Sequence, residues 1–382
     1  MSLDLLRSVT RRLPAAAFLA LILLPGFLLG YDGRWPGPGD ISIRPRAIFP
    51  TKFAPGSFSN FDEWFADRVG FRFPLIYAGT SLHVGLLRRP LDRHIIFGQD
   101  DWMFWTDDRE TVPATMADSR GKLQFSASEI RRIESEVRAI QERFSACRLP
   151  IAIFIAPNKQ SLYGEFLINL DRHAPQTRLD GLMTALSEPA KNMIIDPRPL
   201  MRSAKLMHAP VRLFNKTETH WNDLGAFYGY HSLITALARV APVPHLELAS
   251  LDNYNISVAR YAGGDMAMRV LFSPWRFPDE NVGVTPKVPI AGERENMLDR
   301  RHFLHRNPRG KGRLLLFGDS FASQLVPFLA QHFAEVYRYV GEEIDGAVVA
   351  RLRPDVVLLQ MVERYAGRLL TPHINLAQLC QE

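Results

Sequence analysis

Short apolar runs that alternate with segments of helical periodicity constrain the fold of this chain more than any other feature. Residues 151–156 are apolar at every position, as expected for a central parallel strand that is covered on both faces. Similar runs occur at 193–195, 211–214, 314–317 and 356–359, with helix-like stretches at 179–186, 226–240 and 324–333. Strands that alternate with helices predict an α/β fold, a three-layer sandwich around a mostly parallel central sheet.

The N-terminal segment has a different character. Residues 13–31 carry no charge, and this length is close to the ~20 residues that cross a bilayer as a helix. Arg7, Arg11 and Arg12 precede the run, so the positive-inside rule keeps the N-terminus in the cytoplasm. No small-x-small cleavage site follows, which favours an anchor over a cleaved signal peptide. We therefore expect a cytoplasmic tail over 1–12, a transmembrane signal-anchor over 13–31, a Pro/Gly-rich linker over 32–60 and one folded domain over 61–382.

The expected location limits the chemistry. A domain exported to the periplasm of a bacterium has no ATP or acyl-coenzyme A, so an activated group must be handed to it, and nucleic acid is not an expected partner. The formal charge of +6 is modest for 382 residues. A basic cluster over 300–313 is interpreted as a solvated loop, with a patch for an anionic polymer or lipid headgroups as the alternative. Cys147 and Cys380 could form one disulfide or remain thiols.

The apolar run at 314–317 stops at Gly318-Asp319-Ser320 and is followed by a helix-like stretch. A buried strand that ends in a tight turn places one hydroxyl beside the N-terminus of the next helix, where backbone N–H groups can stabilise an oxyanion. Ser320 is therefore the candidate nucleophile. The structural alternative is that Ser320 only caps this helix.

A second segment, 214–222, supplies Glu218 and His220 two residues apart. A serine hydroxyl needs a base, and that base needs a group that fixes its tautomer. In this interpretation Ser320 attacks, His220 takes the proton and Glu218 orients His220. The alternatives are a surface pair or a metal site, since residues two apart on a strand share a face. No third ligand at a recognisable spacing accompanies the pair, so neither a metal nor a cofactor is predicted.

Six segments in this order resemble the SGNH hydrolase-like alginate O-acetyltransferases, membrane-tethered or periplasmic enzymes that acetylate exopolysaccharides. The segments are Phe65–Arg72, Phe97–Phe104, Pro157–Tyr163, Thr217–Trp221, Gly318–Phe321 and Glu363–Arg364. The family's Asp-x-His element precedes its Gly-Asp-Ser element, a permuted order relative to ordinary SGNH esterases, and this chain has that order. One departure is Glu218, where the family usually has aspartate; glutamate orients histidine in serine triads on other folds. Because the chain ends soon after Arg364, we expect no carbohydrate-binding module of the kind that some members carry.

The resemblance implies a two-step acyl transfer. A membrane-bound O-acyltransferase would supply the acetyl group, Ser320 would carry it with its own backbone N–H in the oxyanion hole, and an exopolysaccharide hydroxyl would accept it. Candidates for substrate positioning are Lys159, Trp221, Asn222 and Arg364, each with a structural role as the alternative. Two competing functions remain: a polysaccharide acetyl esterase, and a non-catalytic tethered subunit of a polysaccharide synthesis or export complex.

Overall fold

The computed structural model describes most of the chain, in two compact units. The described residues are 3–31, 46–51, 55–89, 92, 94–106, 115–167, 176–240, 246–270, 276–289, 296–297, 301–372, 374–375 and 379. One unit comprises Met1–Asp92 and Ala267–Pro274, and the other comprises Arg93–Met266 and Trp275–Glu382. The predicted boundaries at residues 12, 31 and 60 stay a prediction.

The first unit contains three helices: α1 (Leu3–Phe27), α2 (Ser57–Ala66) and α3 (Arg72–Leu87). Backbone bonds connect their ends, with Gly70 N donating to Pro25 O at 2.8 Å. Gly70 suits this approach, because a Cβ there would lie 2.4 Å from the Leu28 carbonyl oxygen. No helix in the described part of the chain is both long and apolar enough to cross a membrane, so the transmembrane helix predicted at 13–31 is not supported.

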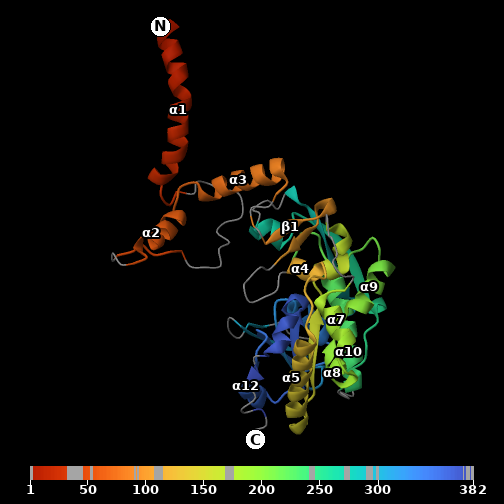
Figure 1. The fold of residues 1–382 in the computed structure, drawn as a ribbon. Coiled ribbons are helices and arrows are strands. Elements are labelled where there is room, and N and C mark those ends of the chain that lie inside the picture. The colour runs from red at the N-terminus through yellow and green to blue at the C-terminus, as the bar shows by residue number, and fades with distance from the viewer. Residues whose placement is uncertain are drawn as a thin grey trace. The chain divides into compact units, whose positions relative to one another are not determined.

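The second unit is built on a seven-stranded sheet in the order β4-β3-β12-β9-β10-β8-β7 (Figure 1). Five neighbouring strands are parallel: β4 (Ile194–Ile195), β3 (Ile151–Ala156), β12 (Val356–Val362), β9 (Arg313–Gly318) and β10 (Glu335–Val340). At the edge, β8 (His302–Arg306) and β7 (Asn296–Met297) are antiparallel. The predicted mostly parallel sheet is confirmed.

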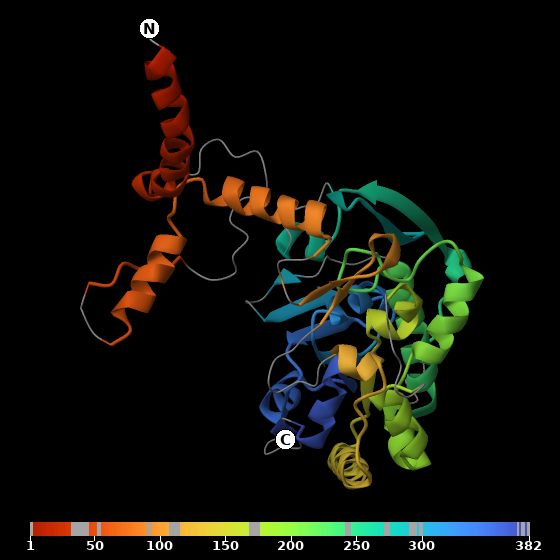
Figure 2. The ribbon, with the colours of Figure 1, turned by 45° about the horizontal axis from the view of Figure 1, so that its top comes forward.

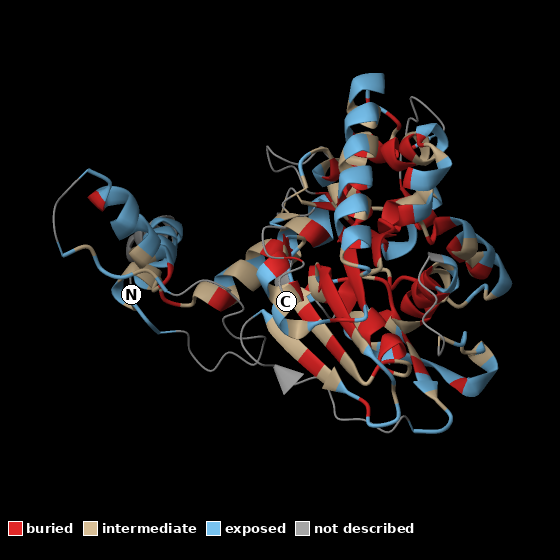
Figure 3. Ribbon diagram, turned by 90° about the horizontal axis from the view of Figure 1, so that it is seen from below, coloured by how far each residue is buried: buried red, intermediate tan, exposed pale blue. Residues whose placement is uncertain are grey.

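Helices cover both faces of this sheet, as predicted for a three-layer sandwich. Alternate residues of each strand point into separate cores; Phe154 belongs to one cluster and Ile153 and Ile155 to the other. The first core is closed by α6 (Lys159–Tyr163), α9 (Arg198–Met207), α10 (Asp223–Val240) and α11 (Ala322–Leu329). The second is closed by α5 (Ala127–Ala146), α7 (Arg178–Ala185), α8 (Glu188–Met193) and α12 (Gly346–Leu352). In Figure 3 the buried strands, in red, lie between these layers.

Local sequence signals account for several element boundaries. Helix α5 begins after a capping box, in which the Ser126 hydroxyl accepts the Glu129 N–H and the Glu129 carboxylate accepts the Ser126 N–H. Residues 95–105 form a hairpin of β1 (Ile95–Phe97) and β2 (Met103–Trp105). The remaining elements are α4 (Thr115–Ser119), short pair β11 (Ile344–Asp345) and β13 (Ile374–Asn375), and the 3-10 segment η6 (Glu363–Leu370).

Two expectations are wrong, and one element was not foreseen. Residues 211–214 form no strand: apart from an isolated bridge from Phe214 to Trp221, their backbone closes a turn in which Leu213 O accepts Asn222 N. Their apolar side chains pack in the first core, although the segment pairs with no described strand of the sheet. The basic segment is not only a loop, because β8 runs through it with Leu304 buried. A twisted ribbon of β5 (Tyr254–Tyr261) and β6 (Asp279–Pro286), teal in Figure 2, was not expected from the sequence.

Candidate active site

Ser320 lies on the turn between β9 and α11, at the carboxyl end of the parallel strands. The Asp319 carboxylate fixes this turn: Oδ1 accepts Phe321 N at 2.8 Å and Gln360 Nε2 at 3.0 Å, and Oδ2 accepts Val362 N at 2.7 Å. The turn is thereby tied to the neighbouring strand β12. The Ser320 side of the turn is exposed, so its hydroxyl is open to a substrate.

The structure brings His220 to this serine. Its Nε2 lies 2.7 Å from Ser320 Oγ, within hydrogen-bond distance. The imidazole also contacts the Phe321 ring, with ring centroids 5.0 Å apart, and Phe321 in turn lies edge-on against the buried Trp221. A rigid aromatic floor therefore supports the base.

Three groups surround the other imidazole nitrogen. From His220 Nδ1, the Thr219 hydroxyl lies at 3.1 Å, Glu218 Oε1 at 3.4 Å and Asp265 Oδ2 at 3.9 Å. The Thr219 hydroxyl donates its one hydrogen to Asp265 Oδ2, so toward His220 it can only accept. The arrangement therefore favours the tautomer with its proton on Nδ1, which leaves Nε2 free to accept the serine proton.

Sequence reasoning missed Asp265, because no spacing rule connects it to the Glu218–His220 pair. Its Oδ1 accepts Thr219 N at 2.8 Å, and its own N–H donates to Glu218 Oε2 at 3.0 Å. Gly264 allows this approach, since a Cβ there would lie 2.7 Å from Glu218 Oε2. A loop far along the chain thus holds the orienting carboxylate in place.

The two carboxylates differ in charge state. Burial acts to raise the pKa of Glu218, but hydrogen bonds from His220 and from Asp265 N–H outweigh it and leave that pKa below its ordinary value. For Asp265, burial and the nearby Glu218 charge raise the pKa. Glu218 therefore carries the more stable negative charge beside His220.

Glu218, His220 and Asp265 also meet the geometric requirement for a site that binds one metal ion. One ligand atom from each lies within 4.8 Å of the others. No recognisable spacing in the sequence pointed to a third ligand, and the fold brings Asp265 beside the pair. These three side chains are the ones that would hold a divalent cation if one binds here.

The four proposed substrate-positioning residues occupy different environments. Lys159 is buried, and its Nζ donates to the Met103 and Lys216 carbonyls at 3.0 and 2.9 Å. Burial lowers the pKa of Lys159 to about 7. Asn222 is buried and caps α10, its Oδ1 accepting Gly225 N at 3.1 Å. Lys159, Asn222 and the buried Trp221 thus all have structural contacts, and their substrate roles stay predictions.

Arg364 lines a pocket beside the candidate active site. Its guanidinium lies 5.8 Å from the Phe321 ring centroid and 5.1 Å from that of Tyr365. The preceding residue, Glu363, is fully buried and pairs with Arg198 at 2.8 Å, and it also accepts Asn158 N at 2.9 Å. This buried network fixes the backbone position from which the Arg364 side chain extends.

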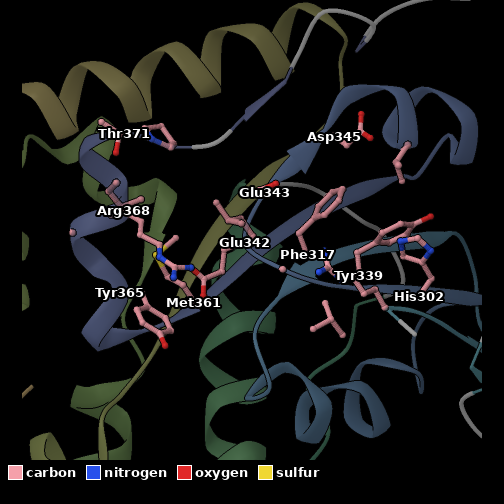
Figure 4. Close-up of a pocket in the computed structure, with 18 of the residues that line it drawn as sticks. His302, Phe317, Tyr339, Glu342, Glu343, Asp345, Met361, Tyr365, Arg368 and Thr371 are labelled. Carbon is pink, nitrogen blue, oxygen red and sulfur yellow. The ribbon is translucent and has the colours of Figure 1, made fainter. Parts of the chain in front are cut away.

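A pocket of about 960 Å³ lies beyond the carboxyl ends of β9, β10 and β12, with Arg364 in its wall. Figure 4 shows Arg368, Glu342 and Tyr365 on one side of it and Tyr339 and His302 on the other. Arg368 forms an ion pair with Glu342. Burial raises the pKa of Glu342 to about 7, although Arg368 acts to lower it.

The raised pKa of Glu342 predicts that the stability of the folded chain depends on pH. Its pKa is about 7 in the folded chain, against an ordinary 4.5, so between these values the folded state binds more protons than the unfolded state. The free energy of unfolding should therefore fall as pH rises through this window, with about 2 kcal/mol assigned to Glu342. Urea denaturation at pH 5 and pH 7 measures this fall. Glu342→Gln should reduce it, and the exposed neighbour Glu343→Gln should not; equal pH dependence in both variants would contradict the assignment.

We predict that Glu218 and Asp265 both contribute to orienting His220. Glu218→Gln and Asp265→Asn should each lower the turnover of an acetyl ester about 10- to 100-fold, because one carboxylate remains. The double variant should lose about 10³- to 10⁴-fold, as in triads without an orienting carboxylate. Steady-state kinetics of the three variants test this, with Asp252→Asn, an exposed site, as the control. Wild-type activity in the Asp265→Asn variant would show that Asp265 does not help to orient His220.

Comparisons with known proteins agree with this architecture. A family model described as "SGNH hydrolase-like domain, acetyltransferase AlgX" matches residues 95–349. The chain is similar to the probable alginate O-acetylase AlgJ of Pseudomonas aeruginosa, with 26% identity over 224 residues, 58% of this chain and 51% of the relative. The corresponding protein of Pseudomonas putida is 23% identical over 220 residues, 56% of this chain and 51% of the relative. The chain thus spans about half the length of these curated relatives.

Among solved structures, the chain is similar to PatB1 of Bacillus cereus. The TM-score is 0.50 at 14% sequence identity, and the match covers 72% of this chain and 96% of PatB1. At this identity the likeness concerns the fold alone, which is the SGNH-like α/β fold expected from the order of the motifs.

Proposed function

From the premise that the chain belongs to the family of AlgX-type SGNH hydrolase-like acetyltransferase domains, we propose that it transfers acetyl groups to hydroxyls of an exopolysaccharide. The observation that carries this proposal is the 2.7 Å contact between His220 Nε2 and Ser320 Oγ, with carboxylates behind the imidazole. This is the arrangement that activates a serine for acyl transfer.

In the first step, His220 Nε2 takes the Ser320 proton as Oγ attacks the acetyl carbonyl carbon. The resulting oxyanion collapses, the donor's leaving group takes the proton from His220, and an acetyl ester remains on Ser320. The Ser320 backbone N–H at the start of the α11 turn is the proposed oxyanion donor. Glu218 stabilises the imidazolium that forms in between.

In the second step, a sugar hydroxyl replaces the leaving group. His220 removes the hydroxyl proton as the sugar oxygen attacks the acetyl carbon, and the proton then returns to Ser320 Oγ as that bond breaks. Arg364, beside Phe321 at the edge of the site, is the proposed positioning residue for substrate. The products are an O-acetylated sugar and free enzyme, so atoms and protons balance.

We place this reaction in the bacterial periplasm, at the inner membrane, with a membrane-bound O-acyltransferase as the acetyl source. The disulfide at Cys147 supports an oxidising compartment. The relatives' name, alginate O-acetylase, supports polysaccharide as the acceptor class.

The test is acetyl release from a chromogenic acetyl ester by the full chain, with and without oligosaccharide acceptors. A transferase should show turnover that rises with acceptor concentration and should yield acetylated oligosaccharide, detected by mass spectrometry. Turnover that does not change with the concentration of any acceptor would identify an esterase. The absence of any Ser320 acetylation would instead support a non-catalytic subunit.

A further inference from the structure

A smaller pocket of about 480 Å³ lies on the Glu218 side of the candidate active site. Its walls come from the 215–223 loop, from the β5–β6 ribbon through Tyr261 and Asn281, and from α11 through Gln324. All of these belong to the same compact unit. The volume falls within the range of about 300–1,000 Å³ that is typical of small-molecule sites.

One wall is a row of three amides whose orientation the backbone dictates. Asn222 Oδ1 accepts Gly225 N, so its Nδ2 is the donor, and this Nδ2 reaches Asn215 Oδ1 at 3.1 Å. Asn215 Nδ2 then donates to Asn281 Oδ1 at 3.0 Å. Because its oxygen must accept, the exposed Asn281 presents its Nδ2 as a donor, and this nitrogen has no hydrogen bond to any described residue.

Two further lining residues carry buried polar atoms that lack a partner. Within the described ranges, neither Trp221 Nε1 nor Gln324 Oε1 makes a hydrogen bond, although both atoms are inaccessible to solvent. Trp221 as a whole is 1% exposed. Buried polar atoms are rarely left unpaired, since this costs about 1–3 kcal/mol each. Because neither atom is open to solvent in this structure, both make the wall of the pocket more polar but are not contact points for a ligand.

The charge of the pocket is negative. Glu218 and Asp223 line it, and no lysine or arginine does so in the part of the chain that the structure describes. Two cations of neighbouring segments are engaged elsewhere: Lys159 with backbone carbonyls, and Arg212 with Asp279 at 2.9 Å. An anionic group placed here would face two carboxylates without a counter-charge.

We propose that this pocket binds one uncharged sugar residue of the acceptor polymer and discriminates against a uronate at that position. This inference rests on the proposed function, because it takes the acceptor to be a polysaccharide. Neutral sugars offer hydroxyl oxygens that accept hydrogen bonds, which matches the free Asn281 Nδ2 donor at the exposed end of the amide row. The carboxylate of a uronic acid would lie against Glu218 and Asp223.

Binding without turnover tests the pocket directly. The full chain with Ser320→Ala is titrated by calorimetry at pH 7 with neutral tetrasaccharides of glucose, mannose and galactose, and with a mannuronate tetrasaccharide. At least one neutral probe should bind about tenfold or more tightly than mannuronate, the equivalent of one lost hydrogen bond or one uncompensated charge. Mannuronate binding as tightly as the best neutral probe, or no binding by any neutral probe, overturns the inference.

A matched pair of variants in the same background locates the binding. Asn281→Asp keeps the oxygen that accepts Asn215 Nδ2, loses the free donor and adds a third carboxylate, so affinity for the neutral probe should fall about tenfold. Asn255→Asp adds the same charge to an exposed position at the far end of the ribbon, opposite Thr285, and should keep the affinity. Equal affinities in the two variants would place the sugar elsewhere.

Ser320 acetylation and sugar binding are separate measurements, so together they distinguish a wrong pocket assignment from a wrong proposed function. Acetylation of Ser320 by a chromogenic ester is measured on the unsubstituted chain by mass spectrometry. A chain that is acetylated on Ser320 but binds no neutral probe refutes the pocket assignment alone. A chain that binds neutral sugar but is never acetylated refutes the transferase chemistry alone.

Discussion

Ser320→Ala is expected to lower acetyl-ester turnover by about 10³-fold or more, and to leave no acetyl group on the chain after incubation with donor. The reason is that, among the described residues, the hydroxyl within hydrogen-bond distance of His220 Nε2 is that of Ser320, with Oγ 2.7 Å away. Initial rates with a chromogenic ester and intact-mass spectrometry measure the two effects.

Ser323→Ala is the matched control for this experiment. It removes a hydroxyl three positions further along, on α11, and should retain activity within about twofold. The polymer offers a second readout: loss of acetyl groups at normal polymer yield in a strain with Ser320→Ala supports catalysis. Unchanged acetyl content with that variant would show that Ser320 is not the nucleophile.

Glu363→Ala is expected to destabilise the chain by about 2–4 kcal/mol, because it removes the fully buried carboxylate that pairs with Arg198 and leaves only Asp180 and Asp196 as carboxylate partners of that guanidinium among the described residues. It also removes the acceptor for Asn158 N and for the Ser161 hydroxyl, at 2.9 and 2.5 Å. Equilibrium urea denaturation of the full chain measures the loss in unfolding free energy.

An exposed ion pair is the control for this stability prediction. Glu188→Ala removes a surface partner of Lys191, 3.5 Å away, and should cost less than about 0.5 kcal/mol. If Glu363→Ala does not fold, Glu363→Gln, which keeps one oxygen acceptor, should still fold and show a measurable loss. A cost below about 1 kcal/mol for Glu363→Ala would mean that the network does not hold the end of β12.

Much of the fold could be predicted because its signals are local. The fully apolar run at 151–156 forms β3 in the middle of the sheet, and Ser126 caps α5 as its side chain allows. The run at 211–214, in which Arg212 interrupts the apolar residues, pairs with no described strand of the sheet, because hydrogen-bond partners depend on segments elsewhere in the chain. The strand β10 was missed because Glu335, Tyr337 and Arg338 break the apolar pattern, although β10 lies inside the sheet between β9 and β8.

The nucleophile and base could be found because each lies in a short motif with a chemical reason. Asp265 could not, since it lies 45 residues after His220, counting from 220 to 265, in a loop without a motif. The same holds for Asn281, whose donor role depends on a chain of amides that begins at a helix cap. Such contacts arise only when separate segments fold against one another.

The amino-acid order by itself determined which residues could act as nucleophile, base and orienting acid, and which segments would form a parallel sheet, because these follow from side-chain chemistry and short-range periodicity. Only the tertiary structure decided that Thr219 and Asp265 share the far side of His220, that the pocket beside Glu218 lacks a cation, and that Glu342 is buried beside Arg368. Distances between segments far apart in sequence, and the burial that shifts their pKa values, exist only once the chain has packed.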